Sequence, residues 1–315
     1  MKRLFYFILL LVGISTIHSC KDLADEDGNP LVDINDNTGL NGPRALYREI
    51  TNSDTLATYY YNGLQMNRVV TPGVKYKYKS NTDVAWSGDK ISRIDFKGHL
   101  DEDNNGVFDQ DSVTYTQQFT YDNFGNVDVI SENRSVFKRG TPTPPATVGP
   151  YALLRKTKTL YKLKYSSSTA KLASITMTTG EDVSTAPFSY TKYSETAYQY
   201  VGDNVSKVTR NYGPIGTGGT FGAAVTKYGY EYSSYDAKIN PFTLLPFAYK
   251  VSRLLRTEVN DVESWILSPN SPTRYTVTDL VPPVPVPVFF STNYNYDPQT
   301  YMQKGYGVNY IYKPL

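Results

Sequence analysis

The segment Phe119-Thr-Tyr121-Asp122-Asn-Phe-Gly125-Asn126-Val127-Asp-Val129 decides the fold class. Its first residues alternate aromatic and polar, which puts two rings on one face of a β-strand. The Asp, Asn and Gly residues that follow turn the chain, and the β-branched residues begin the returning strand. Tyrosine suits a sheet face that is only partly dry, because its ring packs while its hydroxyl stays in water. The segment therefore predicts a β-hairpin.

The same pattern returns along the chain. Longer or looser copies begin at residues 59, 76, 230 and 294. We predict that Tyr121, Tyr165 and Tyr200 lie just before hairpin turns, on strands that pair antiparallel with the next strand. Each tyrosine should lie opposite one of two residues that follow its turn. The predicted partners are Val127 or Val129, Leu172 or Ile175, and Val205 or Val208.

The segments between the hairpins limit which architectures are possible. Their irregular lengths are unlike a strict solenoid. The proline-rich segments 141–150 and 281–288 cannot be central strands, because proline donates no ladder hydrogen bond. We expect a loop over 213–222 and, as the only candidate helix, a short one near 44–50. We predict an all-β fold, an antiparallel β-meander of successive hairpins in a single rolled or barrel-like sheet, over one domain at 46–315.

The residues Tyr121-Asp122-x-x-Gly125-Asn126 resemble the YD repeat of Rhs proteins and teneurins. In those proteins the repeats form hairpins that coil into a shell. The resemblance is close in this copy alone, and it implies the same succession of hairpins here.

The first twenty residues indicate export and lipid attachment. Lys2 and Arg3 precede an apolar run of 14 residues, 4–17, which is too short to span a membrane as a helix but suits a signal peptide. The run leads into Ile17-His18-Ser19-Cys20, which resembles a bacterial lipobox of the looser Bacteroidetes kind. The resemblance implies cleavage of a signal peptide, 1–19, and attachment of lipid such as palmitate to Cys20. An ordinary signal peptide with a chance cysteine is the alternative.

Residues 20–45 form an acidic tether. Six acidic residues and one lysine lie between 21 and 36, so the segment repels itself and extends. It is either a plain solvated linker or resembles the signal that sends some Bacteroidetes lipoproteins to the outer face of the outer membrane. Lipobox, tether and Tyr-rich hairpins together resemble Bacteroidetes lipoproteins of unknown function, including a family with a porin-like fold. The resemblance implies a lipid-anchored outer-membrane protein, on the cell-surface or the periplasmic face, and carries over no catalytic residues.

The composition excludes several classes of function. The chain has 315 residues, one cysteine and two histidines, so a disulfide framework or a His/Cys metal site lacks its ligands. Removal of residues 1–19 takes two of the 32 basic residues and leaves 30 against 30 acidic ones. This neutral balance argues against nucleic acid as a partner. His99 is then the only histidine, and its place before an acidic loop predicts a solvated turn residue.

One acidic loop has the spacing of a calcium site. It resembles the loops of EF-hands and dockerins, with Gly106 at the turn position. The candidate ligands are Asp101, Asp103, Asn105, Asp109 and Asp111. The twelfth position holds Ser112 instead of a bidentate carboxylate. The sequence leaves two interpretations, a hairpin tip without metal or a weak calcium site, and predicts no other cofactor.

Four further residues have weaker signals. Thr55 and Ser112 lie in Asp-Thr/Ser-aliphatic triplets, which resemble the O-glycosylation pattern of exported Bacteroidetes proteins. Trp86 and Trp265 either stack on sugar rings or belong to the core and the sheet faces. No phosphate loop or nucleophile motif is present in the sequence, and nothing selects a catalytic pair among the 30 acids.

These observations predict a non-catalytic binding or structural role at the cell envelope. The membrane is the partner through the lipid anchor, and a glycan or an envelope protein is a further candidate partner. Two alternatives stay open. A carboxylate-dependent glycan hydrolase needs two carboxyl groups about 5–10 Å apart in a cleft. An integral outer-membrane β-barrel needs uninterrupted apolar outer strand faces, which Lys and Arg interrupt here.

Overall fold

A computed structural model describes residues 44–72, 79–100, 111–141, 149–257 and 260–314. These residues contain seventeen strands, one α-helix and two 3-10 helices. The strands are β1 (Arg44–Ile50), β2 (Thr55–Asn62), β3 (Gln65–Thr71), β4 (Ser80–Ser87), β5 (Lys90–Gly98), β6 (Ser112–Tyr121), β7 (Val127–Arg139), β8 (Tyr151–Tyr165), β9 (Leu172–Glu181), β10 (Lys192–Val201), β11 (Asn204–Pro214), β12 (Thr226–Tyr235), β13 (Pro272–Asp279), β14 (Pro287–Ser291), β15 (Asn295–Tyr296), β16 (Met302–Gly305) and β17 (Val308–Pro314). The helices are η2 (Thr217–Gly219), α2 (Phe247–Leu254) and η3 (Asn260–Leu267).

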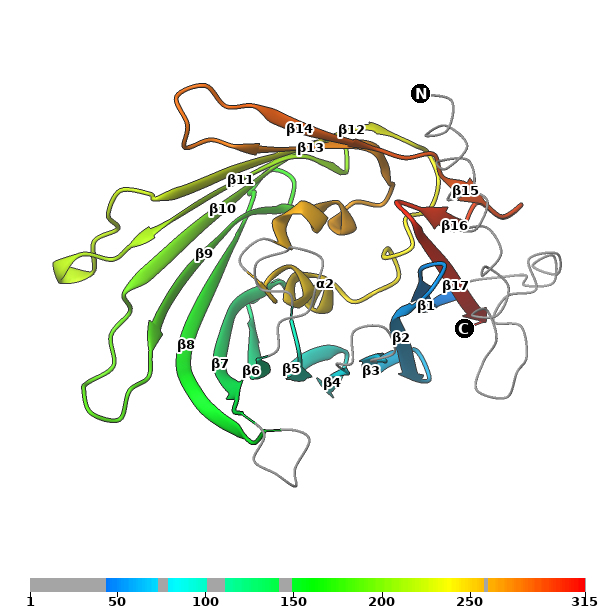
Figure 1. Ribbon diagram of the computed structural model, residues 1–315. Coiled ribbons are helices and arrows are strands. Elements are labelled where there is room, and N and C mark those ends of the chain that lie inside the picture. Colours follow the sequence, from blue (N-terminus) through cyan, green and yellow to red (C-terminus); the bar gives the residue numbers. More distant parts are fainter. Residues whose placement is uncertain (1–43, 73–78, 101–110, 142–148, 258–259, 315) are drawn as a thin grey trace, which may run out of the picture.

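All strands belong to one antiparallel sheet. From β1 to β14 each strand pairs with the next, and β1 also pairs with β17, which continues to β16 and β15. The two edges are therefore β14 and β15, which are consecutive in the chain, and no described pairing joins them. The sheet rolls around an interior without closing (Figure 1). The predicted all-β meander of hairpins is confirmed.

The predicted hairpin pairs are also confirmed. Tyr121 lies opposite Val127, Tyr165 opposite Leu172, and Tyr200 opposite Val205, each across an antiparallel hairpin. An irregularity of register directly precedes each tyrosine. The same irregularity precedes Tyr61 and Trp86, so the bulge is part of the repeat.

The aromatic residue before each turn joins its hairpin to the preceding one. Its ring N–H or O–H donates to the backbone carbonyl of the residue after the previous turn, or in the first case to β1. We call this row the aromatic ladder. Its bonds are Tyr61 to Leu46 (2.8 Å), Trp86 to Met66 (2.8 Å), Tyr121 to Ile91 (2.7 Å), Tyr165 to Val127 (2.9 Å), Tyr200 to Leu172 (3.0 Å) and Tyr235 to Val205 (2.5 Å).

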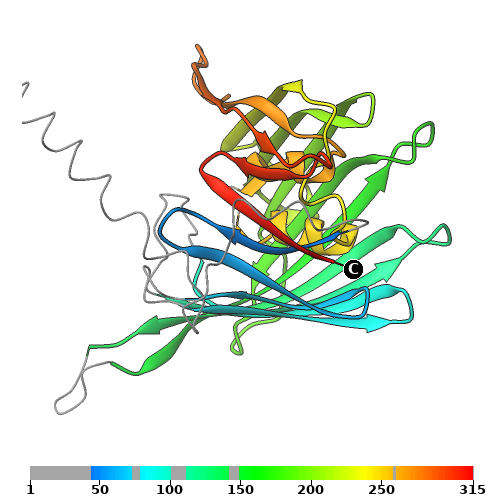
Figure 2. The same cartoon turned by 90° about the vertical axis from the view of Figure 1, so that its right-hand side faces the viewer.

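The two ends of the rolled sheet differ in their connections. Tight turns at 63–64, 88–89, 122–126, 166–171 and 202–203 form what we call the short-turn end. Figure 2 shows several of these turns gathered on one side of the molecule. The opposite, long-loop end has the longer connections 182–191, 215–225 and 280–286. Gly202 has φ +57° at its turn, a conformation that glycine adopts without strain.

The connection between β12 and β13, residues 236–271, folds into the interior, and we call it the plug. It leaves the short-turn end, forms α2 and η3, and lies within the roll in both views (Figures 1 and 2). Phe242, Tyr249, Val251 and Ile266 of the plug are almost fully buried, so they complete the core that the inward-facing strand residues begin. The plug thus turns an open sheet into a filled shell.

Ion pairs fix the plug to the sheet. Arg253 of α2 bonds Glu49 of β1 at 2.7 Å and Glu263 of η3 at 2.9 Å. The Tyr59 hydroxyl also donates to Glu49. Removing one partner of such a buried cluster costs about 3–5 kcal/mol, because the remaining charge stays buried.

Three expectations need correction. Residues 44–50 are strand β1, not a helix, because they pair on both sides with β17 and β2. The plug helices α2 and η3 were not predicted. Part of the segment 213–222 is ordered as the end of β11, a bridge between Ile215 and Phe221, and η2. The prolines after 281 behave as expected, since β14 pairs only with β13 and lies at an edge.

Candidate functional site

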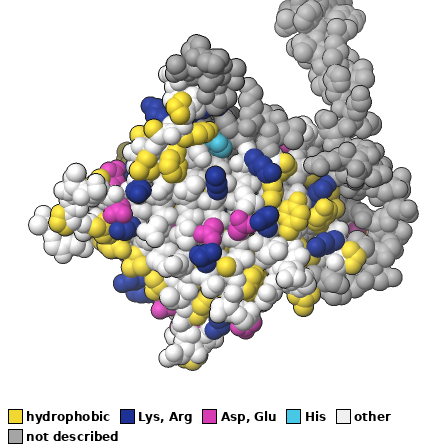
Figure 3. Space-filling model, turned by 90° about the horizontal axis from the view of Figure 1, so that it is seen from below, with side chains coloured by type: hydrophobic (Ala, Val, Ile, Leu, Met, Phe, Trp, Pro, Cys, Tyr) yellow, Lys and Arg dark blue, Asp and Glu magenta, His cyan; other side chains and the backbone are white. Residues whose placement is uncertain are grey.

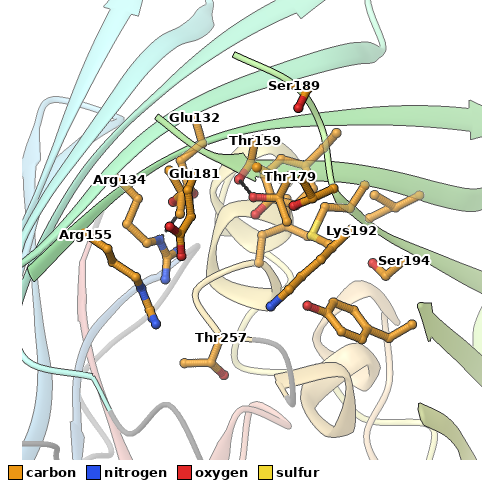
Figure 4. Close-up of a pocket in the computed structure, with 18 of the residues that line it drawn as sticks. Glu132, Arg134, Arg155, Thr159, Thr179, Glu181, Ser189, Lys192, Ser194 and Thr257 are labelled. Atoms are coloured by element: carbon orange, nitrogen blue, oxygen red, sulfur yellow. Dashed lines mark hydrogen bonds and ion pairs between the residues drawn. The ribbon is translucent and has the colours of Figure 1, made fainter. Parts of the chain in front are cut away.

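A cavity of about 610 Å³ opens at the long-loop end, and we call it the mouth cavity. The inner faces of β7 to β11 form its wall, and residues 255–257, which follow α2, and Asp261 of η3 form its floor (Figure 4). Its volume is typical of a small-molecule site, roughly 300–1,000 Å³.

Strand register brings polar side chains together in rows on the wall. Glu132 of β7 is opposite Thr159 of β8, which is opposite Thr179 of β9, which is opposite Lys192 of β10. The Thr159 and Thr179 hydroxyls are 2.7 Å apart. A neighbouring row contains Arg134, Thr157 and Glu181. These residues are distant in sequence, and the meander alone places them side by side.

The same strand face is apolar further from the mouth. On β8 the inward residues run from Tyr165 and Leu163 through Tyr161 to Thr159 and Thr157. On β9 the face changes likewise, from Leu172 and Ile175 to Thr179. The polar wall is therefore the continuation of the hairpin pattern, with hydroxyl and charged groups in place of aliphatic and aromatic ones.

A chain of hydrogen bonds fixes the floor to the wall. Ser252 of α2 donates to Gln117 at 2.6 Å, and Gln117 donates to Glu132 at 2.7 Å. Arg134 donates through Nε to Glu132 at 2.8 Å and through Nη1 to the Arg256 carbonyl at 2.9 Å. Because Glu132 is buried, its charge needs these donors. They also hold the Arg134 guanidinium at the edge of the cavity.

A second ion pair fixes the other side of the floor. Arg210 of β11 bonds Asp261 at 2.9 Å, and the Tyr232 hydroxyl donates to the Asp261 backbone carbonyl at 2.8 Å. Burial raises the pKa of the Asp261 carboxyl, while the Arg210 guanidinium acts to lower it. The ion pair with Arg210 therefore keeps the Asp261 carboxyl in a fixed position, and this fixes the floor to β11.

Two buried polar groups on the floor have no hydrogen-bond partner. They are Nε of Arg256 and the hydroxyl of Thr257, a residue that is only 8% exposed. Arg256 does use another nitrogen, which donates to Tyr249 at 3.2 Å, and its guanidinium lies over the Tyr249 ring. A buried group without a partner costs about 1–3 kcal/mol, so these two atoms are places where a ligand or water would bond.

Among the described residues that line the mouth cavity, five are basic and three are acidic. Two of the acids, Glu132 and Asp261, are each bonded to an arginine. Figure 4 shows Arg134, Arg155 and Lys192 extending from three different strands toward one space, with Thr257 on its other side. Basic groups from several strands therefore lie near one another in this space.

A second cavity, of about 600 Å³, lies at the short-turn end. Rings of the aromatic ladder line it, including Trp86, Tyr121, Tyr165 and Tyr200, together with Phe247 of the plug. The polar atoms of these ladder rings already donate to backbone carbonyls. Burial raises the pKa of Tyr200 to about 12, so its hydroxyl remains a donor at neutral pH. These rings serve the packing of successive hairpins.

Most of the site residues predicted from sequence lie outside the described part of the chain. These are Cys20, Asp101, Asp103, Asn105 and Asp109. Asp111 directly precedes β6, Ser112 is its first residue, and Thr55 is the first residue of β2. Among the described residues no three His, Cys, Asp or Glu side chains group as a metal site. Calcium binding, glycosylation and lipidation remain predictions. Of these residues, the three that the structure describes, Thr55, Asp111 and Ser112, do not line the mouth cavity.

The structure places the remaining candidates in packing roles. His99 was expected to be solvated, which is wrong, since the residue is 9% exposed and its ring lies 6.3 Å from that of Tyr151. Trp265 belongs to the core, where it packs edge-on against Phe242. Trp86 takes a position of the aromatic ladder.

The sequence reasoning missed every residue of the mouth cavity. A signal was present: on the β8 segment, Thr157 and Thr159 continue the period-two phase that Tyr161, Leu163 and Tyr165 set for the inner face. Polar residues at positions that continue the inward-facing alternation indicate that this part of the interior is open to water. The floor residues had no such signal, because their position depends on the plug.

Comparison with known proteins adds no relative, since no protein-family model matches the chain and no curated protein matches it significantly. None of the helices in the described ranges is long and apolar enough to cross a membrane. The geometry of the mouth cavity is therefore the basis for a functional proposal.

Proposed function

We propose that the chain is a lipid-anchored outer-membrane protein that binds a small polar ligand in the mouth cavity without transforming it. The observation that carries the proposal is the pair of buried, unpartnered groups on the cavity floor, Arg256 Nε and the Thr257 hydroxyl. They belong to residues that line the mouth cavity, where Glu132 and Asp261 are each held by an ion pair with an arginine. A bound ligand would offset the cost of burying them.

The outer face of the sheet supports a lipid anchor at Cys20 as the contact with the membrane. Cross-strand ion pairs lie on this face, between Arg68 and Asp83 and between Lys207 and Glu231, and their side chains are about half exposed. Figure 3 shows basic and acidic side chains dispersed over one side of the molecule, among hydrophobic and other side chains. Such a face suits water, whereas a lipid-facing strand surface is apolar.

The position of β1 is compatible with this arrangement. Because β1 is antiparallel to β2, Arg44 lies at the short-turn end, opposite the mouth cavity. The 24 residues from 20 to 43 can reach about 80 Å when extended. An anchor at Cys20 would therefore leave the mouth cavity free to face away from the membrane.

The carboxylates of the cavity favour binding over hydrolysis. A glycan hydrolase needs one carboxyl as acid and a second as base or nucleophile. Glu132 accepts from Arg134 and Gln117, and Asp261 accepts from Arg210, so both buried carboxylates are engaged in the fold. Glu181 alone does not make a catalytic pair.

A thermal-shift screen of small molecules tests the proposal. A ligand should raise the melting temperature of the normal chain but not of Thr157→Trp, which fills the mouth cavity from β8. The matched control is Thr176→Trp on the outer face of β9, which should respond like the normal chain. Mass spectrometry should recover the ligand unchanged. Equal stabilisation of Thr157→Trp, or recovery of a cleaved product, would contradict the proposal.

The anchor has its own test. Cys20→Ser should abolish incorporation of labelled palmitate and release the protein from the membrane fraction. Continued labelling of the variant would show that the lipobox interpretation is wrong.

A further inference from the structure

We infer that the long-loop end carries a second membrane contact, an uncharged apolar rim of three neighbouring connections that inserts into the interface of a lipid bilayer. The apolar rim consists of residues 182–191, 215–225 and 280–291, and the structure describes all of them. The inference goes beyond the proposed function, because it does not depend on a ligand in the mouth cavity.

The three connections lie side by side. The backbone N–H of Ile215 donates to the Thr191 carbonyl at 2.8 Å, which joins the first connection to the second. The backbone N–H of Leu280 donates at 2.8 Å to the carbonyl of Lys227, two residues after the second connection. In Figure 1 the three connections project on the left of the sheet, each at the end of its own hairpin. Their tips therefore form one continuous row of loops.

The apolar rim is almost without charge. Its 33 residues include one charged side chain, Asp182, which bonds Lys158 of β8 at 3.1 Å. Charged residues make up 20% of the whole chain, and the tight turns of the short-turn end have four among 17 residues. The scarcity of charge is therefore a property of this rim and not of hairpin connections in general.

The apolar side chains of the rim are exposed. Of the twenty large hydrophobic residues that are exposed in the described part of the chain, eleven belong to the rim. Val284 and Val286 are the most exposed of these, at 76% and 73%, while Val183, Phe221 and Val225 represent the other two connections. Single exposed apolar residues are normal on a protein surface, whereas a gathered group marks a contact with protein or membrane.

The arrangement favours a bilayer over a protein partner. The exposed side chains lie on three separate hairpin ends, and a fluid interface accommodates each of them independently. A protein partner would need a continuous surface of complementary shape. Because the rim lacks charge, burial of its apolar side chains supplies the attraction, which suits a zwitterionic lipid surface.

The tether allows this contact even though the chain enters β1 at the short-turn end. The longest strand, β8, has 15 residues and spans about 50 Å. The 24 residues from 20 to 43 can reach about 80 Å, which exceeds the length of the sheet. An anchor at Cys20 thus permits either end to face the membrane, and the rim would select the long-loop end.

Flotation with phosphatidylcholine vesicles tests the inference on the processed chain, residues 20–315, with Cys20→Ser so that no acyl chain contributes. The protein should float with the vesicles. Added salt should not weaken the binding, because the rim is uncharged.

Paired variants locate the contact. Val284→Asp combined with Val286→Asp should lower the vesicle partition coefficient at least about tenfold, because apolar contacts are lost and charges are added. The matched control is Leu64→Asp combined with Phe124→Asp at the short-turn end, where Leu64 is 77% exposed, and it should leave partitioning unchanged. Val183→Asp and Val225→Asp should each weaken binding severalfold. Circular dichroism verifies that each variant is folded.

Three outcomes would overturn the inference. The first is a parent chain that does not float with the vesicles, and the second is an equal loss in both double variants. The third is self-association without vesicles, seen by sedimentation velocity and abolished by the Val284 and Val286 changes, which would assign the rim to a second copy of the chain. Full binding by Val183→Asp and Val225→Asp would refute the rim of three connections. None of these results bears on the ligand test with Thr157→Trp.

Discussion

The short-turn end and the long-loop end are built from the same strands and the same strand face, yet they have opposite chemistry. At the short-turn end the inner face is aromatic and aliphatic, and the aromatic ladder uses its polar atoms within the fold. At the long-loop end the face has threonines, arginines and acids around the mouth cavity. A repeated hairpin can therefore keep its register at one end while its other end varies for binding.

The largest expected difference between the ends is in the free energy of unfolding. Tyr165 and Thr157 are both inward residues of β8, one at each end. Tyr165→Ala should lower stability by about 3 kcal/mol, because it removes a packed ring and a ladder hydrogen bond. Thr157→Ala should cost less than about 1 kcal/mol. Urea unfolding measures both, and equal losses would show that the ends do not differ in this way.

The plug extends from one end of the roll to the other. Its buried residue Lys250, on α2, allows a further test of the interior that lies between the two ends. Lys250 is 8% exposed, no described residue forms an ion pair with it, and burial lowers its pKa from 10.5 to about 8. Below pH 8 the folded state must hold a buried charge. Lys250→Met should therefore raise stability by about 2–3 kcal/mol at pH 7.

The sign of the pH dependence follows from the same shift. Between pH 8 and 10.5 the unfolded chain binds the Lys250 proton and the folded chain does not, so stability should rise with pH. Above about pH 10 it should fall, because burial raises the pKa of tyrosines such as Tyr198 and Tyr232. Lys250→Met should lack the rising limb. The control, Lys164→Met on the outer face, should keep it, and a rising limb in both variants would exclude Lys250 as its source.

Glycines at the two ends should respond oppositely to alanine. Gly202 in a tight turn has φ +57°, so Gly202→Ala should cost about 1 kcal/mol even though no atom blocks the methyl group. Gly216 in a long connection has φ −81°, and its added methyl group would meet Thr220 at an ordinary 3.5 Å. Gly216→Ala should stabilise by about 0.5 kcal/mol through the unfolded chain. Thermal melts of the pair measure the contrast, which a loss at Gly216 would contradict.

The smallest effect isolates one bond of the aromatic ladder. Tyr200→Phe keeps the ring and removes the hydroxyl that donates to the Leu172 carbonyl, so it should cost about 1 kcal/mol. Tyr60→Phe is the control, because Tyr60 is 46% exposed on the same kind of strand, so this change should alter stability little. A negligible loss at Tyr200 would mean that the ladder positions rings without stabilising the sheet.

The sequence predicted what depends on local pattern. Tyr121 and Tyr165 precede turns as expected, because alternation and turn residues act within a dozen positions. Strand β1 was not recognised, since most of its register is with β17 at the other end of the chain and only three of its residues pair with the neighbouring β2. The helix α2 has only eight residues and depends on the enclosing sheet for its burial, and His99 is covered by a segment remote in sequence.

The mouth cavity was beyond prediction for a related reason. Its wall comes from five strands whose polar residues meet only through register, and its floor is the plug, whose path no motif marks. The sequence did contain one usable signal, the alternation of inward-facing and outward-facing residues along each strand. A threonine at a position where a hairpin repeat calls for a core residue indicates a wet interior, even without a catalytic motif.

The aromatic ladder gives assembly of the protein a direction. Each ring bonds to the carbonyl of the hairpin before it, so a completed hairpin presents the acceptor that the next one needs. A chain that emerges from its N-terminus can add hairpins one at a time onto a growing template. The long-range pairing of β1 with β17 must wait for the last strand, so this pairing is expected to set the rate of folding.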